Sequence, residues 1–274
     1  MTSPDPLRVA AIQMCSGLDK GTNIAAAERL VAQAAAGGAE LIVLPELFNL
    51  YGDLPLAAGE AETVPGPTSE RLAAWAVKWN VYLCGGSIAE ASADSQHALN
   101  TSLLFSPAGT IIASYRKIHL FDVDLPGELT VRESASMHAG MDVVCTRLPR
   151  ATLGQAICYD LRFPELFRIL ATRGMDVLLI PSAFTRTTGE AHWELLIRAR
   201  AVENQCFVIA PNQVGRHSPS SESFGGSLIV DPWGVVLARG STTGEEVLLA
   251  ELDFNRLQEI RRRLPALAHR RLHP

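Results

Sequence analysis

Short, almost continuously apolar runs alternate with helix-like stretches along the whole chain, and this alternation most limits the fold. Residues 41–44 read Leu-Ile-Val-Leu and residues 177–180 read Val-Leu-Leu-Ile, each without a polar position. Strands that are covered on both faces have this pattern, because neither face meets water. Strands that alternate with helices indicate an α/β fold in which the helices cover the sheets. The apolar spacing predicts helices over 21–36, 69–79, 164–173 and 190–203.

The rest of the chain adds turns, a long loop and a tail. Residues 106–109 and 231–234 are typical turn sequences and predict hairpins, whereas residues 122–140 show little periodicity and are expected to form a long loop with one helical turn. No low-complexity linker separates the two halves. A single domain is therefore predicted over 1–274, with its core at about 7–255 and an arginine-rich tail at about 256–274.

Charge and composition exclude several classes of function. The formal net charge is -5, whereas a nucleic-acid-binding protein is expected to carry a basic surface. No run of about 18 apolar residues is present, so no membrane span is expected. The first residues lack the basic and apolar regions of a signal peptide, and the five cysteines include no Cys-x-x-Cys pair. We therefore expect a cytoplasmic protein with free thiols, no cofactor and no metal ion.

Two charged residues follow predicted strands. Glu46 comes directly after Leu44-Pro45, where poor hydration makes a carboxylate a better base; a helix-capping or salt-bridged glutamate is the structural alternative. Lys117 lies between a strand and the long loop, and only three of the 24 basic residues are lysines. An ammonium there could stabilise a developing oxyanion. The alternative is a solvated basic edge, which is the more common place for an Arg-Lys pair.

Cys158 lies where a predicted strand gives way to a helix that opens with Pro164. A strand–elbow–helix arrangement exposes a nucleophile at the carboxyl edge of a sheet and directs backbone N–H groups at the reacting carbonyl. The alternative is a buried structural cysteine. That alternative suits the other cysteines better, because no helix start follows them; these are Cys15, Cys84, Cys145 and Cys206.

Together these segments resemble the nitrilase (carbon–nitrogen hydrolase) superfamily. Glu46 after Leu-Pro, Lys117 in Tyr-Arg-Lys-Ile-His-Leu-Phe-Asp and Cys158 in Cys-Tyr-Asp-Leu-Arg-Phe-Pro-Glu are similar to its Glu–Lys–Cys triad. Pro-Ser-Ala-Phe at 181–184 and Val-Asp-Pro-Trp-Gly at 230–234 resemble the Nit branch, which contains omega-amidases and deaminated-glutathione amidases. The resemblance implies a four-layer α-β-β-α sandwich, with homodimers or higher homo-oligomers.

The resemblance also implies roles for supporting residues. Glu133, sixteen residues after Lys117, matches a fourth acidic residue of the family; without the resemblance it would be a solvated loop carboxylate. The backbone N–H of Tyr159 is expected to join Lys117 in holding the oxyanion. One departure from the family pattern is Glu190, which stands where proline is expected, and it affects only the detail of the substrate loop.

For the substrate, the resemblance implies a small amide that carries a carboxylate. The resemblance favours deaminated glutathione as this substrate, and alpha-ketoglutaramate or alpha-ketosuccinamate is the alternative. A cation is needed for the carboxylate. Arg186 is expected to supply it, since Arg162 is expected to form an ion pair with Asp160 or Glu165. The other expected substrate-binding residues are Tyr51, Phe184 and His192.

Three competing interpretations were weighed. A papain-like Cys–His pair would use His119 or His192 as its base. A catalytically silent binding scaffold on the same fold would explain the fold but not the intact triad. A metal site at His269 and His273 has the right spacing for a helix but no third ligand. We therefore expect an amidase that acts on a small-molecule amide, with no nucleic-acid or membrane partner.

Overall fold

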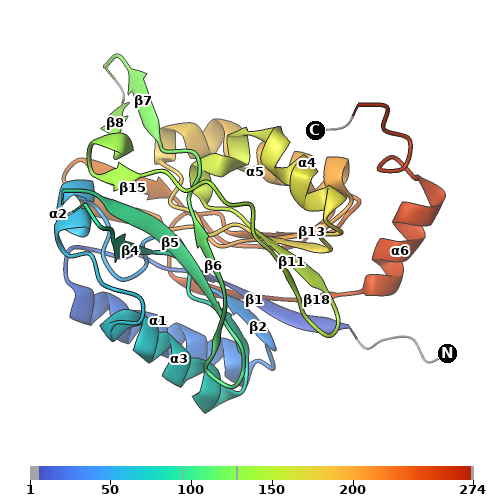
Figure 1. Cartoon of the computed structure of the whole chain (residues 1–274), viewed down its shortest axis with the longest axis horizontal. Coiled ribbons are helices and arrows are strands. Elements are labelled where there is room, and N and C mark those ends of the chain that lie inside the picture. The colour runs from blue at the N-terminus through green and yellow to red at the C-terminus, as the bar shows by residue number, and fades with distance from the viewer. Residues whose placement is uncertain (1–5, 95, 128, 273–274) are drawn as a thin grey trace.

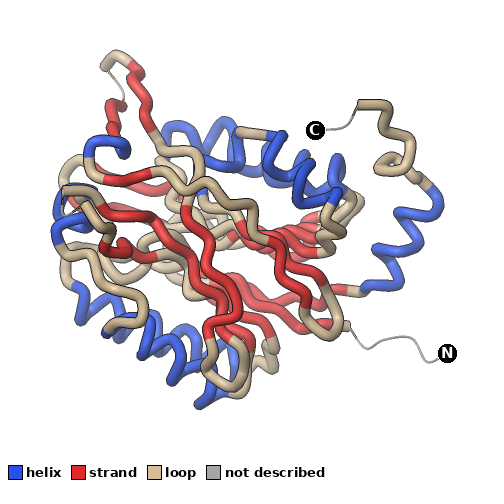
Figure 2. The backbone as a smooth tube through the Cα atoms, in the orientation of Figure 1, coloured by secondary structure: helices blue, strands red, loops and turns tan. Residues whose placement is uncertain are grey.

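Two large β-sheets face each other, and helices cover the outer face of each. The computed structural model describes residues 6–94, 96–127 and 129–272. Figure 1 shows α1 and α3 on one side of the sheets and α4 and α5 on the other, and Figure 2 shows the strands between the two helical layers. The predicted four-layer α-β-β-α sandwich is confirmed. These helices are α1 (Lys20–Ala36), α3 (Pro67–Trp79), α4 (Pro164–Thr172) and α5 (Arg186–Asn204).

The first sheet belongs mainly to the N-terminal half of the chain. Its strand order is β18-β1-β2-β3-β5-β4, and β6 and β9 also pair with β5. Strand β1 runs parallel to β2 but antiparallel to β18, so the end of the chain returns to its beginning. The strands are β18 (Glu246–Leu252), β1 (Leu7–Gln13), β2 (Leu41–Val43), β3 (Tyr82–Cys84), β5 (Ala98–Phe105), β4 (Ile88–Ala91), β6 (Ile111–Arg116) and β9 (Met137–His138).

The second sheet has the order β10-β11-β12-β13-β16-β17. Its central strands β11, β12 and β13 are parallel, as the alternation of strands and helices predicts. The hairpin expected at the turn 231–234 is formed by β16 and β17. The strands are β10 (Cys145–Arg147), β11 (Thr152–Gln155), β12 (Val177–Leu179), β13 (Phe207–Ala210), β16 (Leu228–Val230) and β17 (Val236–Arg239).

Alternate residues of each strand serve two different cores. In β2, Leu41 and Val43 face the other sheet, whereas Ile42 packs under α1 and α3. In β12, Val177 and Leu179 face the first sheet, and Leu178 packs under α4 and α5. Successive side chains of a strand point to opposite faces, so two covered faces require an unbroken apolar run. This explains the sequence feature from which the fold was predicted.

Segment 122–140 differs from the expected long loop. It contains the hairpin β7 (Asp122–Leu125) and β8 (Leu129–Arg132), then the 3₁₀ turn η1 (Glu133–Ala135), and then β9. Figure 1 shows this hairpin projecting from the body of the molecule. Its short strands alternate half-buried and exposed residues, a weak pattern that the sequence argument missed.

Strands β4 and β10 were not predicted as separate elements, and three further parts of the chain were also missed. They are α2 (Leu54–Gly59), the hairpin of β14 (Val214–Ser218) and β15 (Ser221–Phe224), and α6 (Phe254–Arg263). Helix α6 adds Phe254 and Leu257 to the core between the sheets, so packed structure continues past residue 255, where the tail was expected to begin. Among the described residues, no helix is both long and apolar enough to cross a membrane.

A close contact inside α5 gives a test of the packing. A Cβ at Gly189 would lie 2.3 Å from Cβ of Phe224, so Gly189→Ala forces β15 away from the helix. We predict that this substitution lowers the free energy of unfolding by about 1–3 kcal/mol, although alanine normally favours a helix. Gly59→Ala in α2 is the control. No atom lies within 4 Å of that position, and we expect a change of at most about 1 kcal/mol, in the stabilising direction. Equal urea-unfolding midpoints of the two variants would contradict the prediction.

Candidate active site

Cys158 lies at a strained turn beyond the end of β11. It begins the 3₁₀ turn η2 (Cys158–Arg162), and its φ is +45°. Side chains other than glycine rarely adopt this left-handed conformation, which persists only where the surroundings enforce it. The N–H of Cys158 donates to Pro181 O at 2.9 Å, which fixes the turn against the end of β12. Leu47, directly after Glu46, has a similar φ of +46°.

Asp160 anchors this turn from below. Its carboxylate is fully buried and accepts hydrogen bonds from the hydroxyl of Tyr115 at 2.6 Å and from the N–H of Ile157 at 2.9 Å. It also accepts the N–H of His119 at 3.0 Å. Tyr115 and His119 flank Lys117 in sequence, so Asp160 fixes the cysteine turn to the segment that carries the lysine. The ion pair expected between Arg162 and Asp160 is absent from the described residues.

Lys117 lies between two carboxylates. Its Nζ donates to Glu46 Oε1 at 2.9 Å and to Glu133 Oε1 and Oε2 at 3.0 and 2.8 Å. All three side chains are buried, and Lys117 is only 2% exposed. Burial alone would lower the pKa of Lys117, but the carboxylates of Glu133 and Glu46 outweigh it and raise that pKa well above its usual value. The lysine is therefore charged at neutral pH.

These positions decide between the alternatives left open by the sequence. Lys117 is not at a solvated edge, and Glu133 is not a solvated loop carboxylate, because both are buried. Glu46 does form a salt bridge, as one alternative held, and its partner is Lys117. The N–H of Phe121 also donates to Glu133 Oε2 at 2.6 Å, which fixes the start of the β7–β8 hairpin to the same cluster.

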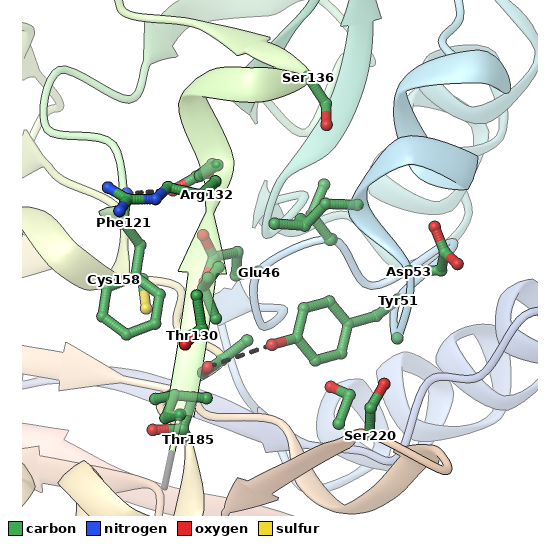
Figure 3. Close-up of a pocket in the computed structure, with 18 of the residues that line it drawn as sticks. Glu46, Tyr51, Asp53, Phe121, Thr130, Arg132, Ser136, Cys158, Thr185 and Ser220 are labelled. Carbon is green, nitrogen blue, oxygen red and sulfur yellow. Dashed lines mark hydrogen bonds between the residues drawn. The ribbon is translucent and has the colours of Figure 1, made fainter. Parts of the chain in front are cut away.

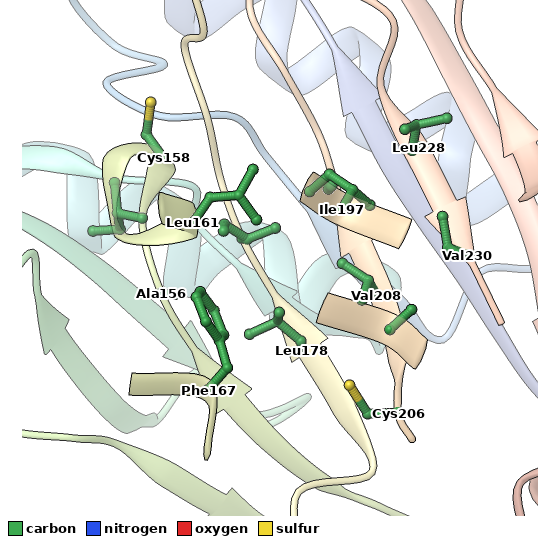
Figure 4. Close-up of a cluster of buried hydrophobic side chains, with 14 of the residues drawn as sticks. Ala156, Cys158, Leu161, Phe167, Leu178, Ile197, Cys206, Val208, Leu228 and Val230 are labelled. Carbon is green, nitrogen blue, oxygen red and sulfur yellow. The ribbon is translucent and has the colours of Figure 1, made fainter. Parts of the chain in front are cut away.

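The thiol of Cys158 completes the cluster. Burial raises its pKa well above the usual value, the Glu46 carboxylate raises it further, and Lys117 opposes both effects. The thiol is therefore protonated in the resting state, beside a carboxylate that can take its proton. In Figure 4 the Cys158 sulfur points away from the other labelled core side chains. Cys206 in that cluster is fully buried, and burial raises its pKa to about 12.

A cavity of about 770 Å³ opens over these groups. Glu46, Lys117, Glu133 and Cys158 all line it. Figure 3 shows Glu46 and Cys158 in one part of the cavity, with the Tyr51 side chain pointing toward them from the other side. The hydroxyl of Tyr51 donates to Ala183 O at 3.4 Å. Tyr51 is thus placed in the wall, where the sequence expected it.

A smaller pocket adjoins Cys158. Its lining includes Tyr159, Arg162, Phe184 and Thr188. The guanidinium of Arg162 lies 5.7 Å from the ring centre of Tyr159 and 5.3 Å from that of Phe184. Phe184, expected as an apolar wall, is in the lining. Arg162 contacts no carboxylate among the described residues, so its charge is available to a ligand.

Two expected substrate-binding residues lie differently. Arg186 lines the large cavity, but it is exposed and forms ion pairs with Glu190 at 3.2 Å and Glu222 at 3.3 Å. Glu190, the residue found in place of the family's proline, is therefore a partner of Arg186. His192 lies on the exposed side of α5 and lines neither pocket; its Nδ1 is 3.3 Å from Arg162 Nη1. It is not positioned to contact a substrate there.

Neither His119 nor His192 is placed to act as the base of a papain-like pair. His119 is not in the lining of either pocket; its Nδ1 lies 2.7 Å from Asp160 Oδ1, and its ring stacks on Phe163 with centres 3.7 Å apart. Of the two histidines considered for a metal site in the tail, His269 is exposed and His273 lies outside the described residues.

Comparison with known proteins identifies the family. The carbon–nitrogen hydrolase family model matches residues 8–262. The chain belongs to the carbon–nitrogen hydrolase family. It is 40% identical to omega-amidase NIT2 of Homo sapiens over 264 residues, covering 96% of this chain and 95% of that protein. It is also 40% identical to deaminated glutathione amidase of Synechocystis sp. over 269 residues, and the match covers 97% of this chain and 98% of that protein.

A solved structure agrees with this assignment. Saccharomyces cerevisiae Nit3, described as a member of branch 10 of the nitrilase superfamily, is 32% identical with a TM-score of 0.89, and the match covers 98% of each chain. The predicted superfamily, its Nit branch and the prediction of an amidase are thus confirmed. The resemblance suggested two activities, omega-amidase and deaminated glutathione amidase, and one relative of each name is 40% identical to this chain.

Asn100 is a site residue of this carbon–nitrogen hydrolase that the sequence argument missed. It lies in β5, is fully buried, and its Nδ2 donates to Glu46 Oε1 at 2.9 Å and to Glu133 Oε1 at 3.2 Å. The amide therefore bridges the two carboxylates on either side of Lys117. The available signal was the polar run Asn100-Thr101-Ser102 between apolar residues of one strand, because buried polar groups require partners.

We predict that Asn100→Leu lowers kcat/KM by roughly 10–10³-fold, because two hydrogen bonds to charged groups are lost. Steady-state rates of amide hydrolysis measure this loss. Thr101→Val is the matched control. The hydroxyl of Thr101 donates to Glu90 Oε2 at 2.6 Å, away from the cavity, so its loss should lower stability and leave kcat/KM unchanged. Equal rates for Asn100→Leu and the wild type would remove Asn100 from the site.

Proposed function

We propose that this amidase hydrolyses its substrate through a thioester on Cys158, with Glu46 as general base and Lys117 as the cation that stabilises the oxyanion. The observation that carries this proposal is the contact of one buried ammonium with two carboxylates in the cavity that also exposes the Cys158 thiol. The arrangement supplies a nucleophile, a base and a positive charge to one reacting carbonyl.

In the first half-reaction, the Cys158 sulfur attacks the amide carbon while Glu46 accepts the thiol proton. The carbonyl oxygen becomes an oxyanion, held by Lys117 Nζ and the backbone N–H of Tyr159 at the start of η2. Glu46 then returns the proton to the amide nitrogen, the C–N bond breaks, and ammonia or an amine leaves. The raised pKa of Cys158 supports this order, because the thiol loses its proton only as it attacks.

In the second half-reaction, water attacks the thioester carbon and Glu46 accepts a proton from it. The tetrahedral intermediate expels the Cys158 sulfur, which regains a proton, and the carboxylic acid product is released. Glu133 keeps Lys117 charged and in place throughout, through its two hydrogen bonds. Its role is therefore to position the lysine.

We predict that Glu46→Gln, Lys117→Met and Cys158→Ala each lower the rate of amide hydrolysis by about 10²–10⁴-fold, measured as release of the carboxylic acid product. Each variant loses a base, an oxyanion donor or the nucleophile. Cys206→Ala, a substitution of a buried cysteine away from the cavity, should retain the wild-type rate per folded molecule. Circular dichroism of each variant reports folding separately. Normal turnover by Cys158→Ala would refute the thioester mechanism.

For the substrate, we propose a small amide that carries a carboxylate, recognised by the Arg162 guanidinium at the side of the cavity next to Cys158. Arg162 is half-buried between aromatic rings and has no carboxylate partner among the described residues, whereas Arg186 already has two. A guanidinium that lacks a partner binds a carboxylate through paired hydrogen bonds. This replaces the expectation that Arg186 holds the carboxylate.

Between the two substrate candidates, the cavity size favours deaminated glutathione. A cavity of about 770 Å³ suits a ligand of drug-like size. Deaminated glutathione has about twice as many non-hydrogen atoms as alpha-ketoglutaramate, and the large cavity has room for them. The names of the two relatives support each substrate equally.

We predict that Arg162→Ala lowers kcat/KM for monoamides of dicarboxylic acids by roughly 10–10³-fold and leaves slow hydrolysis of acetamide nearly unchanged. Arg186→Ala, its control, should change either rate by less than about fivefold, since exposed ion pairs contribute little. Release of the carboxylic acid product from an amide panel that includes deaminated glutathione and alpha-ketoglutaramate measures these values and ranks the two substrates, because the leaving group is an amine in the first and ammonia in the second. If Arg186→Ala lowered kcat/KM for these monoamides more than Arg162→Ala does, Arg186 and not Arg162 would be the residue that binds the substrate carboxylate.

We further propose that the chain forms a homodimer through the outer face of α5. On α5, Ile197 is buried against the sheet and Leu196 is half-buried, but Leu195 is 68% exposed. Val202 on the same helix and Trp233 are also exposed. Large apolar side chains gathered on one face commonly mark an interface.

We predict that light scattering at micromolar concentration gives twice the chain mass of 29.5 kDa. Leu195→Glu should shift the species toward the monomer, because it places a charge in the contact. Leu249→Glu is the control, since Leu249 is exposed on β18 in the other sheet. A wild-type mass equal to one chain would refute the dimer.

A further inference from the structure

Asp94, His97 and His138 form a cluster of metal-ligating groups away from the cavity. One ligand atom from each residue lies within 4.8 Å of the others. His97 Nδ1 is 2.8 Å from Asp94 Oδ2, and His138 Nε2 is 3.1 Å from the same oxygen. None of the three residues lines the large cavity or the pocket beside Cys158. The sequence predicted no metal site, because His138 is remote from the other two along the chain.

We propose that these three residues bind a Zn²⁺ ion. Tetrahedral coordination at about 2.0–2.1 Å places neighbouring ligand atoms roughly 3.3 Å apart. The two separations from Asp94 Oδ2, 2.8 and 3.1 Å, are within about 0.5 Å of that value, so small side-chain shifts would accommodate the ion. Two imidazoles and one carboxylate are typical zinc ligands, and partial exposure of all three leaves a fourth position to water.

The surroundings hold these ligands in place. The other carboxylate oxygen of Asp94 accepts the N–H of Gln96 at 2.9 Å. The hydroxyl of Ser92 donates to Asp94 O at 2.7 Å and to His97 O at 2.6 Å, which closes the turn before β5. The rings of His97 and His138 stack with centres 4.5 Å apart, so both present a nitrogen to the same carboxylate. Hydrogen bonds to ligand groups of this kind orient them for a metal.

The ion would join two strands that lead to the active site. His138 is in β9, which pairs with β5 over only two residues, Ala98↔Met137 and Leu99↔His138. His97 directly precedes β5, the strand that carries Asn100. Glu133 lies five residues before His138. A bound ion would therefore fix β9, and with it the segment of Glu133, to β5.

Zinc titration of chelator-treated protein tests the site, in a Cys158→Ala background so that the thiol in the cavity contributes no ligand. We expect one Zn²⁺ per chain by calorimetry. At a free Zn²⁺ concentration about 100-fold above Kd, Tm should rise by roughly 5–10 °C. Amide exchange in β9 should slow on binding. Co²⁺ in place of Zn²⁺ should give a spectrum without a thiolate charge-transfer band.

Single-ligand variants in the same background decide the location. His97→Gln and His138→Gln should each weaken Zn²⁺ binding by at least about 100-fold, more than the loss of a supporting group costs. Asp94→Asn keeps an oxygen that can accept hydrogen bonds from His97 and His138, but it removes the negative charge, so it should also weaken Zn²⁺ binding. His269→Gln, an exposed histidine elsewhere, should bind like the parent. Absence of binding by the parent, or equal binding by the parent and both ligand variants, would overturn the proposal in favour of a hydrogen-bonded cluster.

Discussion

A buried ammonium determines how this site is built. Lys117 is 2% exposed, and an uncompensated charge at such a position costs several kcal/mol. The two carboxylates that compensate it, Glu46 and Glu133, come from the end of β2 and from η1, in distant parts of the chain. Removing one partner of a buried ion pair costs about 3–5 kcal/mol, so the folded state strongly favours keeping all three segments together. The charge cluster fixes the relative positions of the chain segments that the chemistry uses.

The same cluster decides where the protons are. Burial is the main reason why the pKa of the Cys158 thiol is raised; the Glu46 carboxylate raises it further, and Lys117 opposes both. The pKa of Lys117 is raised as well, so the lysine keeps its protons while the thiol keeps its own. A thiolate can therefore form only together with transfer of its proton to a neighbouring base. The electrostatics of this cavity therefore support the proposed role of Glu46 as general base.

The sequence predicted the parts of the site that follow from local pattern. Glu46, Lys117 and Cys158 each follow a predicted strand, which marked them as candidates. Because β2 and β6 belong to the first sheet and β11 to the second, their proximity comes from the packing of the two sheets. Glu133 was found only through the family resemblance, because no local pattern distinguishes it from a solvated loop residue. Asn100 was missed because its role depends on register: it faces the carboxylates only through the pairing of β5 with its neighbours. Such pairing is a property of the tertiary structure, which local periodicity does not contain.

The position of the cavity follows from the way in which both sheets end. Strands β2 and β12 each run into a proline, Pro45 and Pro181, and proline has no N–H with which to continue a ladder. Beyond these prolines the backbone bonds differently: the N–H of Glu46 donates to Ser182 O at 3.4 Å, from one sheet to the other. Gln213 strengthens this junction, since its side-chain amide donates to Glu46 O at 3.0 Å. The reactive carboxylate is therefore held by backbone contacts between the two sheets, and the cavity opens where each sheet stops pairing within itself.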